Sequence, residues 1–389
     1  MIYLDNAATT QIDPRVKHAM DEWDNFANAG SIHSIGLLAK KEIDKARNSV
    51  AKMLNCKPEQ VIFTSGGSES NATVMHGATC LNKYSAIAYS AVEHESVRLN
   101  AEASSSKLKM VMPIEIPVSV GSGIIRVDAI DEVLLENPEI KLVSVMASNN
   151  EICSVNDISE LAERCHKDKV LFHTDCVQAV ETIDLDMQKF GCDFMSLSAH
   201  KFHGPKGVGV LYCKDRSTMA PLIAGSSSQE FGLRGGTENV PGIIGLGVAA
   251  EIAINEGLTD LDYIMHIKSS FYTHLLGSLV ALNGKEMLAK THYNGFSPSD
   301  VGKIVSMTFD GVDAQSLVLL LSAKNVYISA GSACNAHSTE SSKVLKAIGL
   351  DDEQAHNTVR FSFSKFNTEE EAIKAAEIVA ESVVQLMDC

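Results

Sequence analysis

The sequence lacks the features that mark secreted, membrane or nucleic-acid-binding proteins. Only 33 of the 389 residues are lysine or arginine, whereas 49 are aspartate or glutamate, which gives a formal net charge of −16. A surface of that sign repels phosphate backbones and anionic lipids, so we expect no direct nucleic-acid partner and no membrane partner. Low-complexity runs are also missing, and 45% apolar with 21% charged residues is typical of a folded globular protein.

The nine cysteines lack the spacings of a disulfide framework or a zinc site. Their number is odd, and no two of them form a Cys-X-X-Cys pair. We therefore expect free thiols in a reducing compartment and no bound metal. The amino terminus has neither a signal nor a transit pattern, and no uninterrupted apolar run of 18 residues follows it. The expected location is the cytoplasm.

Apolar strand-like runs alternate with helical patterns along most of the chain. Strands are predicted at 61–64, 85–90, 141–147, 170–175, 195–198 and 208–212, with helices such as 158–167 between them. This alternation predicts an α/β fold with a mostly parallel sheet covered on both faces. Such a sheet binds its ligand at the carboxyl ends of the strands.

A change in the order of the elements predicts a domain boundary near residue 255. We expect residues 14–254 to form a large domain that holds the ligand, and residues 1–13 with 255–389 to form a smaller α/β domain. An apolar helix over 240–254 would precede the boundary, and a charged helix at about 260–268 would follow it.

The first chemical motif follows the strand at 61–64. Residues 64–70, Thr-Ser-Gly-Gly-Ser-Glu-Ser, lead to a helix expected to begin near Asn71. Backbone amides around Gly67 and the hydroxyl of Ser68 would then converge on an anion, most often phosphate. The stretch has neither a Walker lysine nor the dinucleotide glycine spacing, so it supports neither nucleotide class. An ordinary glycine-containing helix cap is the alternative.

Polar side chains follow four of the predicted strands: His94, Asn150, Asp175 with Gln178, and Ser198 with His200 and Lys201. Because the carboxyl ends of parallel strands meet at one edge of a sheet, these groups predict one shared pocket. A lysine in such a pocket suits reaction with a carbonyl cofactor. Taken singly, the lysine could be a solvated charge and the histidine a structural group.

Cys334 lies in Ser329-Ala-Gly-Ser-Ala-Cys-Asn-Ala-His-Ser338, where few side chains are large enough to bury a thiol. Packing is the usual role of a cytosolic cysteine, but this loop is a poor packing environment, so we interpret Cys334 as reactive. A second glycine-rich stretch, residues 225–239, carries Arg234 and Thr237 and is either an anion-binding or an intersubunit loop.

In combination and order, these segments resemble the cysteine desulfurases, members of the class V aminotransferases that use pyridoxal 5′-phosphate. The resemblance runs nearly end to end and rests on residues 3–10, 64–70, 93–94, 149–152, Asp175 with Gln178, 200–201 with 204–207, 234–237, 331–334 and 360–362. It implies the type I aminotransferase fold, with a seven-stranded, mostly parallel sheet in the large cofactor-binding domain and a smaller α/β C-terminal domain.

The resemblance also implies the roles of individual residues. Lys201 would bind the cofactor covalently and then move a proton, Cys334 would attack the substrate sulfur, and His94 would stack on the cofactor ring. Arg360 would clamp the substrate carboxylate, helped by Asn150. The implied cofactor contacts are Gly67, Ser68, Asn150, Asp175 at the ring nitrogen, Gln178 at the phenolic oxygen, Ser198, His200, Lys201, and Thr237 from the partner subunit of a homodimer.

The implied reaction converts L-cysteine to L-alanine and holds the sulfur as a persulfide on Cys334 for a sulfur-acceptor protein. That acceptor could serve iron–sulfur cluster assembly or a thiolation pathway, and the sequence does not choose between them. A selenocysteine lyase or a class V aminotransferase is the nearest alternative. A catalytically inactive sulfur carrier or scaffold with the same fold is the non-enzymatic alternative.

The chain departs from the family pattern at Ala29, Cys153 and Ser364-Lys365, none of which is a position implied to carry the chemistry. We expect Cys153 and Cys176 to be packing residues. The cysteine loop resembles the long form of the housekeeping desulfurases. Because the sequence reaches Cys389 soon after the last predicted helix, we expect no extended tail for docking a scaffold.

Overall fold

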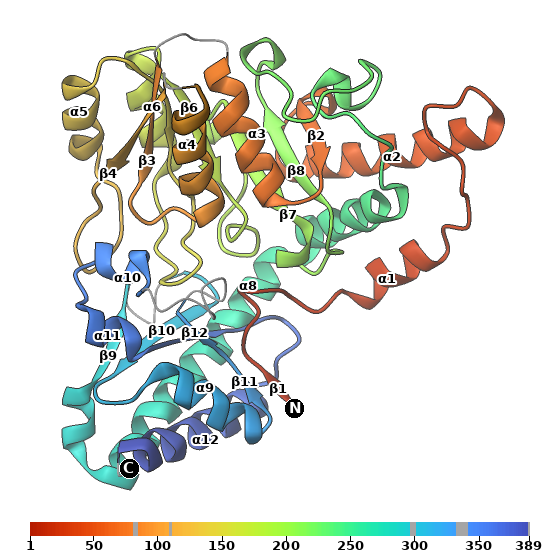
Figure 1. The fold of residues 1–389 in the computed structure, drawn as a ribbon. Coiled ribbons are helices and arrows are strands. Elements are labelled where there is room, and N and C mark those ends of the chain that lie inside the picture. The colour runs from red at the N-terminus through yellow and green to blue at the C-terminus, as the bar shows by residue number, and fades with distance from the viewer. Residues whose placement is uncertain (81–84, 109–110, 296–300, 332–340, 388–389) are drawn as a thin grey trace.

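In the part of the chain that the structure describes, three β-sheets and the helices around them form the fold (Figure 1). The structure is a computed structural model that describes residues 1–80, 85–108, 111–295, 301–331 and 341–387. Cys334 and the residues beside it therefore lie outside the described residues. The largest sheet occupies the upper half of Figure 1, and a smaller sheet with its helices occupies the lower half.

The largest sheet has seven strands in the order β2 (Val61–Thr64), β8 (Gly209–Cys213), β7 (Phe194–Ser198), β6 (Leu171–Asp175), β5 (Ile140–Ser144), β3 (Ser85–Ser90) and β4 (Val111–Ile116). β8 is antiparallel to both of its neighbours, and the other pairs are parallel. The predicted, mostly parallel sheet is therefore confirmed. β4 was not predicted, since this edge strand contains a proline, which interrupts the strand pattern.

Helices cover both faces of this sheet: α1 (Pro14–Asp21), α2 (Ser34–Met53), α3 (Gly67–Cys80), α4 (Glu95–Leu108), α5 (Val127–Glu136), α6 (Ile158–Lys167) and α7 (Met187–Phe190). Neighbouring residues of β2 show why both faces are needed. Phe63 packs in the same core cluster as residues of α2, whereas Ile62 packs with Val74 of α3. Successive side chains of a strand point to opposite faces, so a strand with apolar residues throughout requires cover on both.

The smaller sheet is antiparallel, with strands in the order β12 (Ser329–Ala330), β13 (Thr358–Ser362), β10 (Ile304–Phe309) and β9 (Thr291–Asn294). A third sheet pairs β1 (Ile2–Tyr3) with β11 (Val326–Tyr327) in parallel. Residues 326–330 therefore contribute two short strands to two different sheets. The helices of this half are α9 (Ala314–Ala323), α10 (Lys343–Ala347), α11 (Asp352–His356) and α12 (Glu369–Met387).

A single helix of 44 residues, α8 (Val240–Asn283), replaces the two helices predicted at 240–254 and 260–268. Figure 1 shows it running from the upper half of the molecule into the lower half. Leu246 packs in the core beneath the large sheet, and Phe271 packs in the core of the small sheet. The expected boundary at residue 255 falls inside this helix, and the division into two domains stays a prediction. By length and composition alone α8 could cross a membrane, but a core helix passes the same test.

Short 3-10 helices complete the fold: η1 (Pro58–Gln60), η2 (Ala199–Lys201), η3 (Arg216–Thr218), η4 (Glu230–Gly232) and η5 (Lys285–Lys290). η2 follows β7 directly and ends at Lys201. It therefore holds that lysine at the carboxyl edge of the large sheet.

Candidate active site

A cavity of about 340 Å³ lies at the carboxyl ends of the strands of the large sheet. Ten of the residues singled out from the sequence line it: Gly67, Ser68, His94, Asn150, Asp175, Gln178, Ser198, His200, Lys201 and Arg360. Arg360 comes from β13 of the small sheet, so the cavity is closed by both halves of the molecule. Its volume suits a small cofactor with an amino acid.

One end of the cavity is formed by the first turn of α3. The helix begins at Gly67 rather than near Asn71, because the Ser70 amide donates to the Gly66 carbonyl at 3.1 Å and closes a turn earlier than predicted. Gly67 and Ser68 therefore lie at a helix N-terminus, where free amides attract an anion. A Cβ on Gly67 would lie 2.5 Å from Val177 Cγ2, so the turn requires glycine there.

A fixed carboxylate lies deeper in the cavity. Asp175 Oδ2 accepts a hydrogen bond from Asn71 Nδ2 at 2.7 Å, and Asp175 Oδ1 accepts one from the Val177 amide at 2.8 Å. Asn71 was not singled out from the sequence, since an asparagine in a helix gives no signal of its own. Two donors, one on each oxygen, fix the orientation of this carboxylate.

Glu93 is a second, fully buried carboxyl group in the wall of the cavity. Burial, and then the charge of Asp175, raise the pKa of Glu93 well above its usual value. Its Oε1 accepts a hydrogen bond from the Met146 amide at 2.5 Å. Glu93 therefore favours its neutral form more strongly than an exposed glutamate does. The sequence pattern included Glu93 but indicated no role for it.

His94 is held as a neutral imidazole. The Ser96 amide donates to His94 Nδ1 at 3.1 Å, and Ser96 Oγ lies 2.7 Å from the same nitrogen. Burial lowers the pKa of His94, and the charge of Asp175 opposes this only in part. Asn71 Nδ2 also donates to Ser96 Oγ at 2.9 Å, so one asparagine orients the carboxylate and, through Ser96, the histidine.

The amino-terminal segment reaches into the cavity and contacts Lys201. Lys201 Nζ donates to the backbone carbonyls of Ala7 at 2.6 Å and Ala8 at 2.9 Å. Gln178 Nε2 donates to the same Ala7 carbonyl at 2.8 Å. Gln178 Oε1 is buried and has no hydrogen-bond partner among the described residues, so it is available to a ligand.

Arg360 is almost fully buried and has two protein partners. Its Nη1 donates to the Asn150 backbone carbonyl at 2.7 Å, and its Nη2 donates to Asp5 Oδ1 at 3.0 Å. Arg360 Nε and Asn150 Oδ1 have no hydrogen-bond partner among the described residues. Burial raises the pKa of Asp5, and Arg360 opposes that rise. Asp5 was missed from the sequence, since it lies 355 positions from its partner.

His200 lies in the wall of the cavity, whereas Thr237 lies outside it. His200 lines it and its Nδ1 lies 3.1 Å from Thr9 Oγ1. Burial, and then nearby lysines, lower the pKa of His200 to about 4, so the ring is neutral at pH 7. Thr237 lines a separate hollow with Ser65 and Gly207. Its contribution to a partner's cavity stays a prediction.

These residues fit pyridoxal 5′-phosphate. A helix N-terminus with Ser68 suits the phosphate, and Asp175 suits a protonated ring nitrogen. Gln178 Oε1, an acceptor without a partner among the described residues, suits a phenolic O–H donor. Lys201 lies in the same cavity, as covalent attachment of the cofactor requires.

Comparison with known proteins agrees with this arrangement. Residues 2–374 match the model of the aminotransferase class-V family. The chain is 36% identical over 400 residues to the cysteine desulfurase IscS of Methanosarcina thermophila, covering 99% of this chain and 92% of that protein. It is 37% identical over 391 residues to a cysteine desulfurase of Sinorhizobium fredii, covering 100% of this chain and 97% of that protein.

Solved structures show the same likeness over nearly the whole chain. A NifS-like protein superposes with a TM-score of 0.87 at 30% identity, covering 98% of each chain. SspA, solved in complex with cysteine, superposes with a TM-score of 0.74 at 29% identity, covering 95% of this chain and 100% of that one. The chain therefore belongs to the pyridoxal-phosphate-dependent class V aminotransferases and, among them, to the cysteine desulfurase family.

Proposed function

We propose that this protein converts L-cysteine to L-alanine and holds the released sulfur as a persulfide on Cys334 for transfer to an acceptor protein. The observation that carries the proposal is the cavity that joins Lys201 and Asp175 of the large sheet to Arg360 of the small one. Full-length similarity to cysteine desulfurases supports the choice of substrate.

Bound pyridoxal 5′-phosphate supplies a ring that accepts electrons from the substrate Cα. Asp175, fixed by Asn71 and the Val177 amide, would face the ring nitrogen and keep it protonated. Arg360 binds the substrate carboxylate, for which its unpartnered Nε is available. Lys201 Nζ takes the proton from the substrate Cα.

Cys334 performs the step that distinguishes this reaction from transamination. Its thiolate attacks the sulfur of the bound cysteine, so that a sulfur–sulfur bond forms while the bond between that sulfur and the substrate Cβ breaks. The remaining three-carbon unit leaves as alanine after it takes up protons. His94, whose pKa is lowered by burial, would stack on the cofactor ring and exclude water from that face.

The active form is proposed to be a homodimer in which Thr237 of each subunit contacts the phosphate bound by the other. This is consistent with the position of Thr237 away from the cavity of its own chain. The acceptor is a protein that takes the outer sulfur of the persulfide. Both iron–sulfur cluster assembly and thiolation use sulfur supplied in this form.

Two substitutions test the mechanism. Cys334→Ala should lower alanine formation from cysteine by about 100-fold while keeping the visible absorption of the bound cofactor, because only the attacking thiol is lost. Lys201→Ala should lose the covalent attachment itself. Cys176→Ala, at a buried position with a raised thiol pKa, is the matched control and should keep turnover.

The outcomes also separate the alternatives. If Cys334→Ala formed alanine at the parental rate, the persulfide mechanism would be wrong. Formation of a keto acid from cysteine would indicate an aminotransferase, and strong preference for selenocysteine would indicate a selenocysteine lyase. A parent protein that binds no cofactor would indicate an inactive carrier or scaffold.

A further inference from the structure

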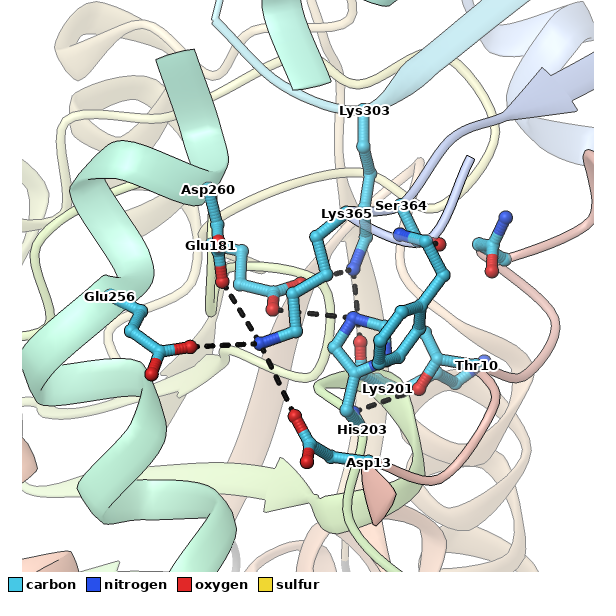
Figure 2. Close-up of polar contacts among 12 residues, drawn as sticks. Thr10, Asp13, Glu181, Lys201, His203, Glu256, Asp260, Lys303, Ser364 and Lys365 are labelled. Carbon is cyan, nitrogen blue, oxygen red and sulfur yellow. Dashed lines mark hydrogen bonds and ion pairs between the residues drawn. The ribbon is translucent and has the colours of Figure 1, made fainter. Parts of the chain in front are cut away.

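A cluster of buried charges lies behind the turn that carries Lys201 (Figure 2). Lys303, Glu181 and His203 form its centre, and their side chains are 1%, 4% and 2% exposed. The reaction described above uses none of them. Buried charges are costly unless they are paired and hydrogen-bonded, so the contacts of this cluster indicate what the charges do.

Lys303 contacts the main chain of Lys201 directly. Its Nζ donates to the backbone carbonyl of Lys201 at 2.9 Å and lies 3.6 Å from Glu181 Oε2. Glu181 Oε1 lies 3.4 Å from His203 Nε2, and His203 follows Lys201 by two residues. The Lys303 ammonium therefore holds the turn through the Lys201 carbonyl. The Glu181 carboxylate lies between this ammonium and His203, which follows the turn.

The backbone around the cluster is strained. Glu181 has a φ of 62° and His203 a φ of 66°, in the left-handed region that residues other than glycine seldom adopt. Gly302, just before Lys303, has a φ of 121°, and a Cβ there would lie 2.2 Å from Cys153 Sγ. Such conformations persist where surrounding contacts impose them, and they are most common at functional sites.

The cluster also connects the two halves of the cavity. Lys303 lies directly before β10, and Ser306 of β10 pairs with Arg360 of β13. From the other side, the His203 amide donates to Thr10 Oγ1 at 2.8 Å. The turn that carries Lys201 is therefore held by the amino-terminal segment and by the strand next to the proposed substrate arginine.

We propose that Lys303, kept in place by Glu181, is a positioning residue for Lys201 that couples the strands carrying Arg360 to the turn carrying the reactive lysine. The proposal rests on the proposed function. A lysine that must reach both the cofactor and the substrate Cα is sensitive to its main-chain position, and misplacement by 1 Å can cost about 100-fold in rate. The charge of Lys303 also acts on the cavity, where it is one of the causes that lower the pKa of His200.

Four variants test this role: Lys303→Met, Lys303→Arg, Glu181→Gln and, as control, Lys365→Met. Lys365 is a buried lysine of the neighbouring ion pairs, 3.0 Å from Asp260 and 3.7 Å from Asp13 (Figure 2). Each variant is measured by the rate at which the cofactor-free protein attaches pyridoxal 5′-phosphate, by the pH midpoint of the bound cofactor's visible absorption, by kcat and KM for cysteine, and by thermal unfolding.

Lys303→Met should slow covalent attachment about tenfold, move the absorption midpoint by about 0.5 pH unit or more, and lower kcat about tenfold with KM changed less than about twofold. Lys303→Arg, which keeps the charge and a donor, should recover part of each effect. Glu181→Gln should change the same quantities in the same direction by less. Lys365→Met should lower the unfolding temperature and leave attachment and midpoint as in the parent.

Parental attachment, midpoint and kcat in Lys303→Met, with only a lower unfolding temperature, would overturn the proposal. If Lys303→Met does not fold, the same measurements on Glu181→Gln test the proposal, because this substitution keeps the volume of the side chain. Parental attachment, midpoint and kcat in Glu181→Gln would then overturn it. A parent that attaches the cofactor but forms no alanine from cysteine would refute the proposed function alone, because the attachment rates still test Lys303.

Discussion

Glu93 and Asp175 are two carboxyl groups in the wall of one cavity, and their surroundings differ. Asp175 receives two hydrogen bonds, whereas burial and the charge of Asp175 raise the pKa of Glu93 well above the usual 4.5. Folded protein therefore keeps a proton on Glu93 that the unfolded chain releases above about pH 4.5. The stability that neutral Glu93 provides is complete below that pH and is lost as the pH rises towards the folded-state pKa.

Glu93→Gln should remove this pH dependence, because glutamine stays neutral. Between about pH 5 and about pH 8, the unfolding free energy of the cofactor-free variant should rise relative to the parent, by at most about 1.4 kcal/mol per pH unit. Urea unfolding at both pH values measures it. The exposed Glu136→Gln is the control and should follow the parent. Equal pH dependence in the parent and Glu93→Gln would show that Glu93 is charged.

The sequence alone predicted those cavity residues that come directly after a strand, because an apolar run shows where a buried strand ends. Asp175 and Lys201 are examples, and both line the cavity. It did not predict Asp5 or Lys303, whose partners are 355 and 102 positions away. No local pattern marks such pairs, since only the packing of the two sheets brings them together.

At the scale of the element, α8 was predicted as two helices because its middle is polar and contains Gly257. The structure shows why the helix continues. Its first part packs under the large sheet and its last part under the small one, so tertiary contacts at both ends stabilise the exposed middle. Helix propensity is a weak guide where packing decides.

Two glycines of α8 should respond oppositely to the same substitution. A Cβ on Gly247 would lie 2.7 Å from Ala46 Cα on α2, whereas a Cβ on Gly257 would meet no atom within 4 Å. Gly247→Ala should therefore destabilise the protein by about 1–3 kcal/mol, since two closely packed helices must separate. Gly257→Ala should stabilise it by about 0.5–1 kcal/mol. Urea unfolding of both variants measures this, and destabilisation by both would contradict it.

At the scale of the whole molecule, the segment between α1 and α2 projects from the body at the right of Figure 1. Apolar side chains are unusually exposed on it, with Phe26 94% and Ile32 93% accessible, and Leu38 of α2 is exposed as well. Exposed apolar groups gathered in one region mark an interface. This surface is a natural candidate for the proposed contact between subunits.

Substitution of Ile32→Asp together with Leu38→Asp should dissociate the proposed dimer, because burying two new carboxylates at an interface is costly. Cofactor retention should fall in parallel if Thr237 acts across the interface. Light scattering and visible absorption measure the two effects. Leu135→Asp, which changes an exposed leucine of α5, is the control and should keep the oligomeric state and the cofactor retention of the parent. A monomeric parent that retains its cofactor fully would refute the intersubunit role of Thr237.

The contact between Asp5 and Arg360 has a consequence for how the protein is made. One member of the pair is among the first residues that a ribosome produces, and the other comes 355 positions later. β1 likewise pairs with β11, and Lys201 contacts Ala7 and Ala8. A nascent chain therefore has no complete cavity until Arg360 has been made, so a chain that ends before this residue lacks the group proposed to bind the substrate carboxylate.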